Sequence, residues 1–225
     1  MTVEIIDSIP AICIRFTTDR PVDITPYLLK GAIINDYPAH GILPYINGDL
    51  RGQISYPRVQ VKVLRQQLCV FGVAEGHELV MSFGDELKQL QVDNSCYIVE
   101  GHESLRSEFN FRVAKETYHR YKFITPWVAL SRRILAQFTS LVPSERVAFL
   151  NRLLVQNILF LAREFGLEVP YNISVRVKLQ SVSPRVVEEQ GSGSFKGYFT
   201  TNVRLPDYLG LGNGITKGLG TIVAI

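Results

Sequence analysis

The sequence predicts an α+β protein of two small domains, residues 1–118 and 119–225. A chain of 225 residues is long enough for two domains that each have a core. Strand-like and helix-like stretches follow one another in both halves in the order of a βαββαβ unit. Apolar residues make up 46% of the chain and charged residues 20%, which is typical of a folded globular protein.

The first half begins with residues 3–16, whose Ile and Val content predicts a strand. Either Asp23 or Thr25 can cap a helix that has Pro26 in its first turn and ends near Asn35. Residues 36–53 contain two prolines and three glycines, and therefore predict an irregular loop.

A pair of strands follows at 54–64 and 68–76, joined around Arg65–Gln67. In the segment VQVKV (59–63) valines alternate with polar residues, which predicts a strand with one buried face. We expect a short helix over 76–91 and more strand over 95–116.

The second half opens with YHRYKFITPWVAL (118–130), which predicts one strand with Pro126 and Trp127 near its end. The strongest helix signal covers 144–165, where apolar residues recur at spacings of three and four and form one stripe. Gly166 stands in the position that commonly ends a helix.

Two long strands are then predicted, 173–189 and 194–206, linked by a turn at 190–193. The chain finishes with a glycine-rich loop and TIVAI, a terminal strand.

Charge is distributed unevenly along the chain. Residues 1–118 carry 11 Lys and Arg against 15 Asp and Glu, whereas residues 119–225 carry 13 against 6, and the chain as a whole has a net charge of +3. A polyanion such as RNA would favour the basic half, because neutralising phosphates provides most of the sequence-independent affinity. A basic face that contacts only solvent is equally compatible with this distribution.

Cysteine usage and the termini restrict the class of protein. Cys13, Cys69 and Cys96 lie far apart in apolar segments, which predicts buried, reduced thiols. No Cys or His cluster has zinc-ligand spacing, so we expect neither a motif-bound metal nor another cofactor. No apolar run has the length of a membrane span, and the first residues lack a secretion signal, so we expect a cytoplasmic protein.

The segment GLGNGITKGLG (210–220) is the most informative local feature. Its five glycines allow positive φ angles and close approach of a ligand to the backbone. It lacks the GxxxxGK[ST] pattern of a Walker A loop, and too few residues follow it for the helix of a dinucleotide-binding fingerprint. Two interpretations remain, a flexible connection or a loop that binds a nucleic-acid backbone. The candidate contacts are Gly210, Gly212, Asn213, Gly214, Lys217, Gly218 and Gly220.

Three segments together resemble one known family. FTTNVRLPDYLGLGNGITKGLGTIV (199–223) is similar to the C-terminal signature of the CRISPR-associated repeat endoribonucleases, the Cas six family of the RAMP superfamily. LRGQISYPRVQVKV (50–63) and YKFITPWVALS (121–131) resemble two further segments of one branch, in the family order. Asn213 stands where the family often has Lys, and Leu219 where it usually has Phe.

The resemblance implies two ferredoxin-like (RRM-like) domains in tandem. It also implies cleavage of precursor CRISPR RNA within its repeats, by attack of the RNA's own 2′-OH and without a metal ion, to give guide RNAs. The implied partner is CRISPR repeat RNA, with other CRISPR-associated effector proteins as further candidates. We expect a monomer or homodimer with no membrane partner.

Among four histidines, His40 is the candidate catalytic residue, because it lies in the loop after the first helix, where the family has its catalytic histidine. Histidine suits proton transfer because its ordinary pKa is about 6.5. Related members often carry a second histidine two positions later, where this chain has Ile42. Candidate helpers are Tyr37, Tyr45 and Lys30, for which packing or exposure to solvent is an equally compatible role.

Basic residues in both halves are candidates for RNA contact. Arginine can bind a phosphate with two hydrogen bonds and lysine as a point charge. The candidates are Arg51, Arg58 and Lys62 in the first half, and Arg132, Arg133, Lys196 and Arg204 in the second. Two alternatives to the nuclease stay open: an RNA-binding protein of the same superfamily without catalysis, and an enzyme that binds a nucleotide with its glycine-rich loop.

Overall fold

The computed structural model describes residues 8–109, 117–167, 169, 172–187 and 192–225. These residues form two compact units. The N-terminal unit is Ile9–Phe109 together with Thr216–Gly218, and the C-terminal unit comprises the described remainder of the chain. The tip of the glycine-rich loop therefore belongs with the N-terminal unit, although it is far from that unit in sequence.

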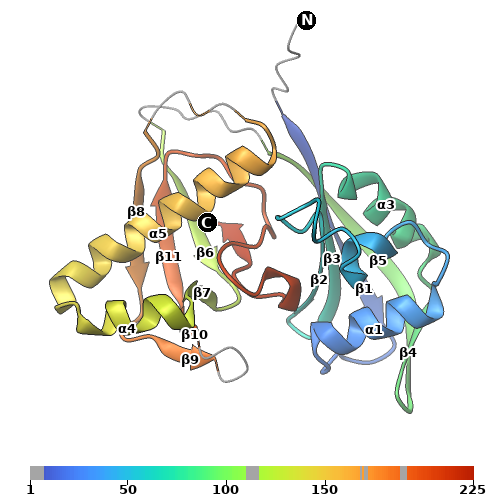
Figure 1. Cartoon of the computed structure of the whole chain (residues 1–225). Coiled ribbons are helices and arrows are strands. Elements are labelled where there is room, and N and C mark those ends of the chain that lie inside the picture. Colours follow the sequence, from blue (N-terminus) through green and yellow to red (C-terminus); the bar gives the residue numbers. More distant parts are fainter. Residues whose placement is uncertain (1–7, 110–116, 168, 170–171, 188–191) are drawn as a thin grey trace, which may run out of the picture. The chain divides into compact units, whose positions relative to one another are not determined.

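The N-terminal unit is a five-stranded antiparallel sheet with two main helices (Figure 1). The strand order is β2-β3-β1-β5-β4, so the unit is ferredoxin-like with β4 added as a hairpin to β5. In chain order the elements are β1 (Ile9–Thr18), α1 (Pro26–Asp36), α2 (Leu43–Asn47), β2 (Val59–Leu64), β3 (Gln67–Val73), α3 (Gly76–Glu86), β4 (Gln89–Val92) and β5 (Ser95–Phe109).

Helices α1 and α3 share one hydrophobic core with the sheet. Ile14 and Phe16 of β1, Leu29 of α1, and Val80 and Phe83 of α3 are all buried in it. The hydroxyl of Thr25 caps α1 by accepting a hydrogen bond from the Leu28 N–H, 3.4 Å away, which confirms the predicted start of the helix. Residues 36–53 were predicted to form an irregular loop, but this region contains the short helix α2.

Both faces of β2 are buried, and this corrects the prediction of a half-exposed strand. The side chains of Gln60 and Lys62 are fully buried. The Gln60 amide donates to the Tyr56 hydroxyl, 2.9 Å away, and the Lys62 ammonium lies 6.0 Å from the centre of the Phe71 ring. Alternation of valine with polar residues therefore does not identify a solvent-facing surface here.

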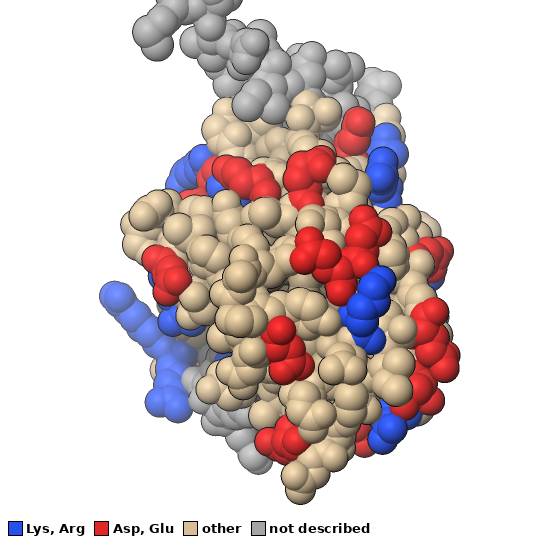
Figure 2. Space-filling view, turned by 90° about the vertical axis from the view of Figure 1, so that its right-hand side faces the viewer, with Lys and Arg blue, Asp and Glu red and all other residues tan. Residues whose placement is uncertain are grey.

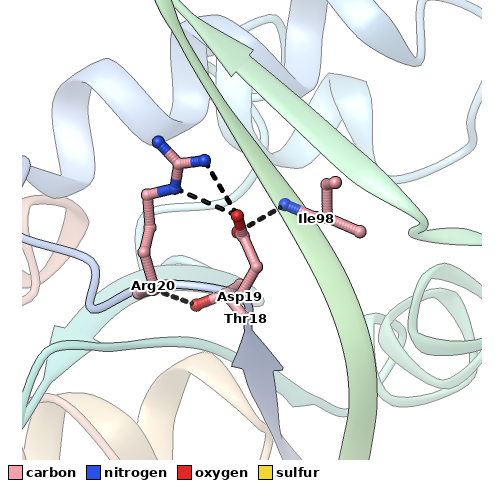
Figure 3. Close-up of polar contacts among 4 residues, drawn as sticks. All are labelled: Thr18, Asp19, Arg20 and Ile98. Carbon is pink, nitrogen blue, oxygen red and sulfur yellow. Dashed lines mark hydrogen bonds and ion pairs between the residues drawn. The ribbon is translucent and has the colours of Figure 1, made fainter.

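Asp19 fixes the end of β1 against β5 (Figure 3). One carboxylate oxygen accepts hydrogen bonds from the Arg20 guanidinium at 2.9 and 3.1 Å, and the other accepts from the Ile98 N–H at 2.9 Å. These bonds stabilise the carboxylate form and hold the pKa of Asp19 below its ordinary value. The pairing of β1 with β5 is irregular beside this point, between Thr17 and Thr18.

The C-terminal unit contains two sheets. Its elements are β6 (His119–Phe123), β7 (Trp127–Leu130), α4 (Arg132–Ser140), α5 (Pro143–Glu164), β8 (Val175–Leu179), β9 (Arg185–Val187), β10 (Ser192–Phe195), β11 (Gly197–Thr201) and β12 (Ile222–Ala224). The main sheet has the order β12-β6-β11-β8, which is also the ferredoxin-like order, and the small one has the order β7-β10-β9. The protein thus has two tandem ferredoxin-like domains.

The second helix of the usual ferredoxin-like order is missing between β11 and β12. Residues 202–221, all of them described, form a long connection with one short 3₁₀ turn at Ile215–Lys217. This connection contains the glycine-rich loop. The predicted repetition of βαββαβ in each half therefore holds fully only for the first.

Several predicted boundaries in the second half are wrong. The single strand at 118–130 is two strands in different sheets, β6 and β7, separated at Ile124–Pro126. Each of the two long strands is also divided between the sheets, and α4 was not predicted. Helix α5 is confirmed, and Gly166 follows its end with a φ of +64°. Of the predicted turn at 190–193, residues 190 and 191 lie outside the described residues.

Candidate active site

His40 lies in the connection between α1 and α2, with its side chain only 7% exposed. Its ring meets the Phe83 ring edge to face, 5.3 Å between centres. The main-chain N–H of Ile42 donates a hydrogen bond to His40 Nδ1 across 3.1 Å. Because Nδ1 accepts this bond, the neutral ring carries its proton on Nε2.

Glu86 faces the other nitrogen of the ring. Its Oε1 lies 3.6 Å from His40 Nε2 and accepts a hydrogen bond of 2.9 Å from the Ser82 hydroxyl, one turn earlier on α3. The two side chains line a pocket of about 460 Å³ with Asp36, Tyr37 and Leu79. Glu86 is not recognisable as a site residue from the sequence, because an acidic residue at the end of an amphipathic helix is typical of a solvent-exposed surface.

Tyr37, a predicted helper, is in the same pocket, but its hydroxyl already has backbone partners. The hydroxyl donates to the Gln89 carbonyl at 3.1 Å and accepts from the Lys88 N–H at 3.0 Å. Its ring also packs against Phe83, 5.6 Å between centres. These contacts join the end of α1 to the start of β4.

Lys30 and Tyr45, the other predicted helpers, line a second pocket of the N-terminal unit, of about 240 Å³. Arg51, Arg58 and Thr216 also line it. The structure therefore divides the four catalytic candidates between two pockets, with His40 and Tyr37 in one and Lys30 and Tyr45 in the other.

The second pocket is basic, because its lining includes three cationic side chains and no acidic one among the described residues. The Lys30 ammonium donates to the carbonyl of Thr216 at 2.7 Å. Burial, and then the like charges of Arg51 and Lys217, lower the pKa of Lys30. An anion bound in this pocket would relieve that repulsion.

Arg58 and Lys62 both have buried side chains, although Arg58 also contributes to the lining of the second pocket. Arg58 is 7% exposed, and its Nε donates to the Glu75 carboxylate at 2.9 Å. Lys62 is fully buried, and this burial lowers its pKa to about 8. Burial of these two side chains disfavours their predicted contact with RNA.

Main-chain hydrogen bonds, within the loop and to residues before and in β7, hold the glycine-rich loop in place. The N–H of Asn213 donates to the Val128 carbonyl, that of Gly220 to the Pro126 carbonyl, and that of Leu211 to the Gly220 carbonyl, over 2.9–3.0 Å. Gly220 has a φ of +69°, and a Cβ there would lie 1.9 Å from the Leu211 carbonyl oxygen. Part of the loop's backbone is thus hydrogen-bonded to β7 and to the residue just before it, and glycine at position 220 allows the close packing.

The predicted basic residues of the second half are all exposed. Arg132 and Arg133 begin α4, Lys196 separates β10 from β11, and Arg204 follows β11. Exposed cations that were not predicted to contact RNA include Arg120 and Lys122 of β6, and Arg176 and Lys178 of β8.

The side of the N-terminal unit that carries α1, α3 and β4 shows Asp and Glu side chains scattered among uncharged ones, with fewer Lys and Arg (Figure 2). In the described part of the chain, no cluster of His, Cys, Asp and Glu could hold a metal ion. No helix among the described residues is long and apolar enough to cross a membrane. The three cysteines are free; Cys13 and Cys69 are buried as predicted, whereas Cys96 is partly exposed, contrary to the prediction.

Two tandem ferredoxin-like domains, a pocket histidine after the first helix and a C-terminal glycine-rich loop define a protein of the Cas6 class. The chain belongs to the Cas6b family within it. Residues 7–110 match the family model of the Cas6b N-terminal domain, and residues 113–225 match that of the Cas6b C-terminal domain.

Solved structures agree in fold. A Cas6b crystal structure superposes with a TM-score of 0.80 and 22% identity, over 97% of this chain and 100% of the other. A second, described as the CRISPR RNA processing endoribonuclease Cas6b, gives a TM-score of 0.69 and 21% identity over the same shares. An uncharacterized protein of Methanocaldococcus jannaschii is 29% identical over 144 residues, which are 62% of this chain and 94% of that protein.

Proposed function

We propose that the chain is an endoribonuclease that cuts precursor CRISPR RNA within its repeats, without a metal ion. Membership of the Cas6b family in both halves supports the substrate class. The observation that supports catalysis most directly is the fixed imidazole of His40, whose Nδ1 is bonded to the main chain while its Nε2 faces a pocket.

The proposed reaction uses a nucleophile from the RNA. The 2′-oxygen attacks the adjacent phosphorus, the bond from phosphorus to the 5′-oxygen breaks, and the products end in a 2′,3′-cyclic phosphate and a 5′-hydroxyl. One proton leaves the 2′-hydroxyl and one is delivered to the 5′-oxygen. The protein has to place donors and acceptors for these protons and stabilise the negative charge of the phosphorane-like transition state.

His40 acts in this scheme as a hydrogen-bond donor to the charge that develops on the phosphoryl group. The lone pair at Nδ1 is occupied by the Ile42 N–H, so the group available to the substrate is Nε2–H. The neutral ring keeps this proton, and its Nε2–H donates a hydrogen bond to a phosphoryl oxygen; one such donor contributes roughly 10²–10³-fold to the rate. Glu86 and Phe83 hold the ring in this orientation.

The basic pocket supplies phosphate binding. Lys30 and Arg51 provide positive charge there, and Thr216 brings in the tip of the glycine-rich loop. Lys30 is partly buried beside Arg51 and Lys217, so a phosphate oxygen that enters gains three favourable charge interactions. This pocket holds the RNA backbone beside the cleaved position.

Cleavage in the presence of EDTA tests the proposal. The protein is incubated with its own repeat RNA, and the product ends are identified by mass spectrometry. We expect a 2′,3′-cyclic phosphate, and no product from an RNA with a single 2′-deoxy substitution at the cleaved nucleotide. Cleavage that survives this substitution, or that needs a divalent ion, would overturn the mechanism.

Two other outcomes would favour the alternatives. RNA that binds tightly but is never cut would identify an RNA-binding protein of the same superfamily. A rise in the thermal unfolding midpoint with ATP or NAD, and none with RNA, would identify a nucleotide-binding enzyme instead.

A further inference from the structure

One face of the main sheet in the C-terminal unit carries an ordered set of basic side chains. Tyr198 of β11 is opposite Lys122 of β6 and Lys178 of β8. Two residues further on, Thr200 is opposite Arg120 and Arg176 of the same two strands. Because directly paired residues project from the same face, and the side-chain period of a strand is two, all six side chains lie on one face.

The residues between them point to the opposite face, which is covered. Tyr121, Phe123 and Phe199 are buried, and their rings pack together at 5.1–5.3 Å between centres. Helix α5 packs along β8, where the Asn151 side chain accepts a hydrogen bond from the Val177 N–H at 2.8 Å. The four cationic side chains of the other face are exposed, and Tyr198 is half-buried among them.

The charge of this face has one sign. The strands β6, β8, β11 and β12 contain no Asp or Glu. The Arg120 guanidinium lies 5.0 Å from the centre of the Tyr198 ring, and the Lys122 ammonium lies 5.9 Å from it. An aromatic ring at the centre of four cations combines a surface on which a base can stack with charges that phosphates can bind.

We infer that this face, which we name the Tyr198 platform (Arg120, Lys122, Arg176, Lys178, Tyr198 and Thr200), binds a single-stranded segment of RNA. A base stacks on Tyr198, and the flanking phosphates contact the two basic pairs. Four-stranded sheets of this topology bind single strands through central aromatic side chains. The RNA identity of the ligand rests on the proposed function, whereas the platform shares no residue with the pockets of His40 and Lys30.

The RNA must be single-stranded where it contacts Tyr198. A base within a duplex is stacked between its neighbours and cannot place its face on Tyr198, so a duplex would gain only the charge contacts. An acidic protein segment would likewise use the four cations but would not need the ring. The effect of removing the ring, compared with the effect of removing charge, therefore distinguishes RNA from other polyanions.

Fluorescence anisotropy of the full chain with labelled oligouridylate of about 12 nucleotides tests the platform, since this length lies within the usual site size of a single-strand binding domain. We expect Tyr198→Ala to weaken binding about tenfold and Tyr198→Phe to retain affinity within about twofold. The double variant Lys122→Gln/Lys178→Gln should reduce the slope of log affinity against log salt by about 1.4.

The matched control is Arg163→Gln, which removes one exposed positive charge from α5, the helix packed against the opposite face. We expect it to leave the affinity for oligouridylate within about twofold. Thermal unfolding of each variant verifies that the fold is retained, and a 4-thiouridine crosslink to the peptide containing Tyr198 locates the base independently.

Three results would overturn the inference. They are equal affinity of Tyr198→Ala and wild type, equal loss in Arg163→Gln and the double lysine variant, or equally effective competition by poly-glutamate and oligouridylate. Each concerns binding alone, so each can occur while repeat cleavage is intact. Conversely, a chain that binds oligouridylate through Tyr198 but never cuts repeat RNA would contradict the proposed function and leave the platform standing.

Discussion

The main-chain N–H of Ile42 donates a hydrogen bond to Nδ1 of His40, two residues earlier in the chain. Where the family that the sequence resembles often has a second histidine, this chain has Ile42, whose side chain is buried in the core. The backbone of residue 42 thus fixes the tautomer of the one imidazole in this pocket, and Glu86 faces its other nitrogen.

Glu86→Gln should slow cleavage about three- to tenfold and leave KM within twofold. The amide keeps the shape of the side chain but removes the charge beside Nε2, so the ring is held less firmly. Single-turnover cleavage gives the rate, and nitrogen chemical shifts of the imidazole report the tautomer. Glu78→Gln is the matched control, because Glu78 contacts His77 at 2.9 Å on the same helix. An equal loss of rate in both variants would contradict the claim that Glu86 holds the His40 ring.

Lys30→Met should weaken binding of repeat RNA and reduce its salt dependence by about 0.7 on a log–log scale, the value for one lost phosphate contact to a single strand. Lys30 is one of the three cationic residues that line the basic pocket. Lys88→Met provides the comparison, because the Lys88 ammonium bonds to the Asp85 carbonyl outside that pocket. Filter binding at several salt concentrations measures both slopes, and identical slopes would contradict the assignment of the basic pocket.

Lys62 should make the protein more stable as pH rises from about 8 to 10.5. Its folded pKa is about 8 and its ordinary pKa is 10.5, so in this window the unfolded chain binds the extra proton. The free energy of unfolding should therefore increase with pH, by up to about 3 kcal/mol. Urea unfolding of wild type and Lys62→Met over this range isolates the effect as a difference. A flat difference would mean that the Lys62 amine is not desolvated.

Gly220→Ala should destabilise the protein by about 3 kcal/mol or more, because the new Cβ would combine a positive φ with a clash against the Leu211 carbonyl. Gly52→Ala is the control, since its Cβ would meet nothing within 4 Å. We expect that variant to stay within about 0.5 kcal/mol of wild type. Urea denaturation measures both, and equal stabilities would show that the loop has room to rearrange.

Local signals in the sequence were sufficient for much of the fold. Thr25 and Pro26 give the start of α1, the apolar stripe gives α5, and Gly166 gives its end, because each is a preference within one or two turns of helix. The division of 118–130 into β6 and β7 depends on which distant strands pair with each piece. No pattern within 13 residues specifies that pairing.

The site was only partly predictable for the same reason. His40 was found from its position after a helix, but the residue facing its Nε2, Glu86, is 46 positions away. Lys62 was predicted to be exposed to solvent, because the sequence does not show that both faces of β2 are buried. The alternation of basic residues in YHRYKF and VRVKL was present in the sequence, yet only the strand register places both beside Tyr198.

The most direct measurement of the central claim is single-turnover cleavage of repeat RNA in EDTA by wild type and His40→Ala, with RNA affinity measured on the same samples. We predict a loss of at least about 10²-fold in rate, with the dissociation constant changed by less than about twofold, because His40 stabilises the transition state and does not hold the strand. A variant that cleaves at the wild-type rate would contradict it, and so would one whose lost activity is explained entirely by lost binding.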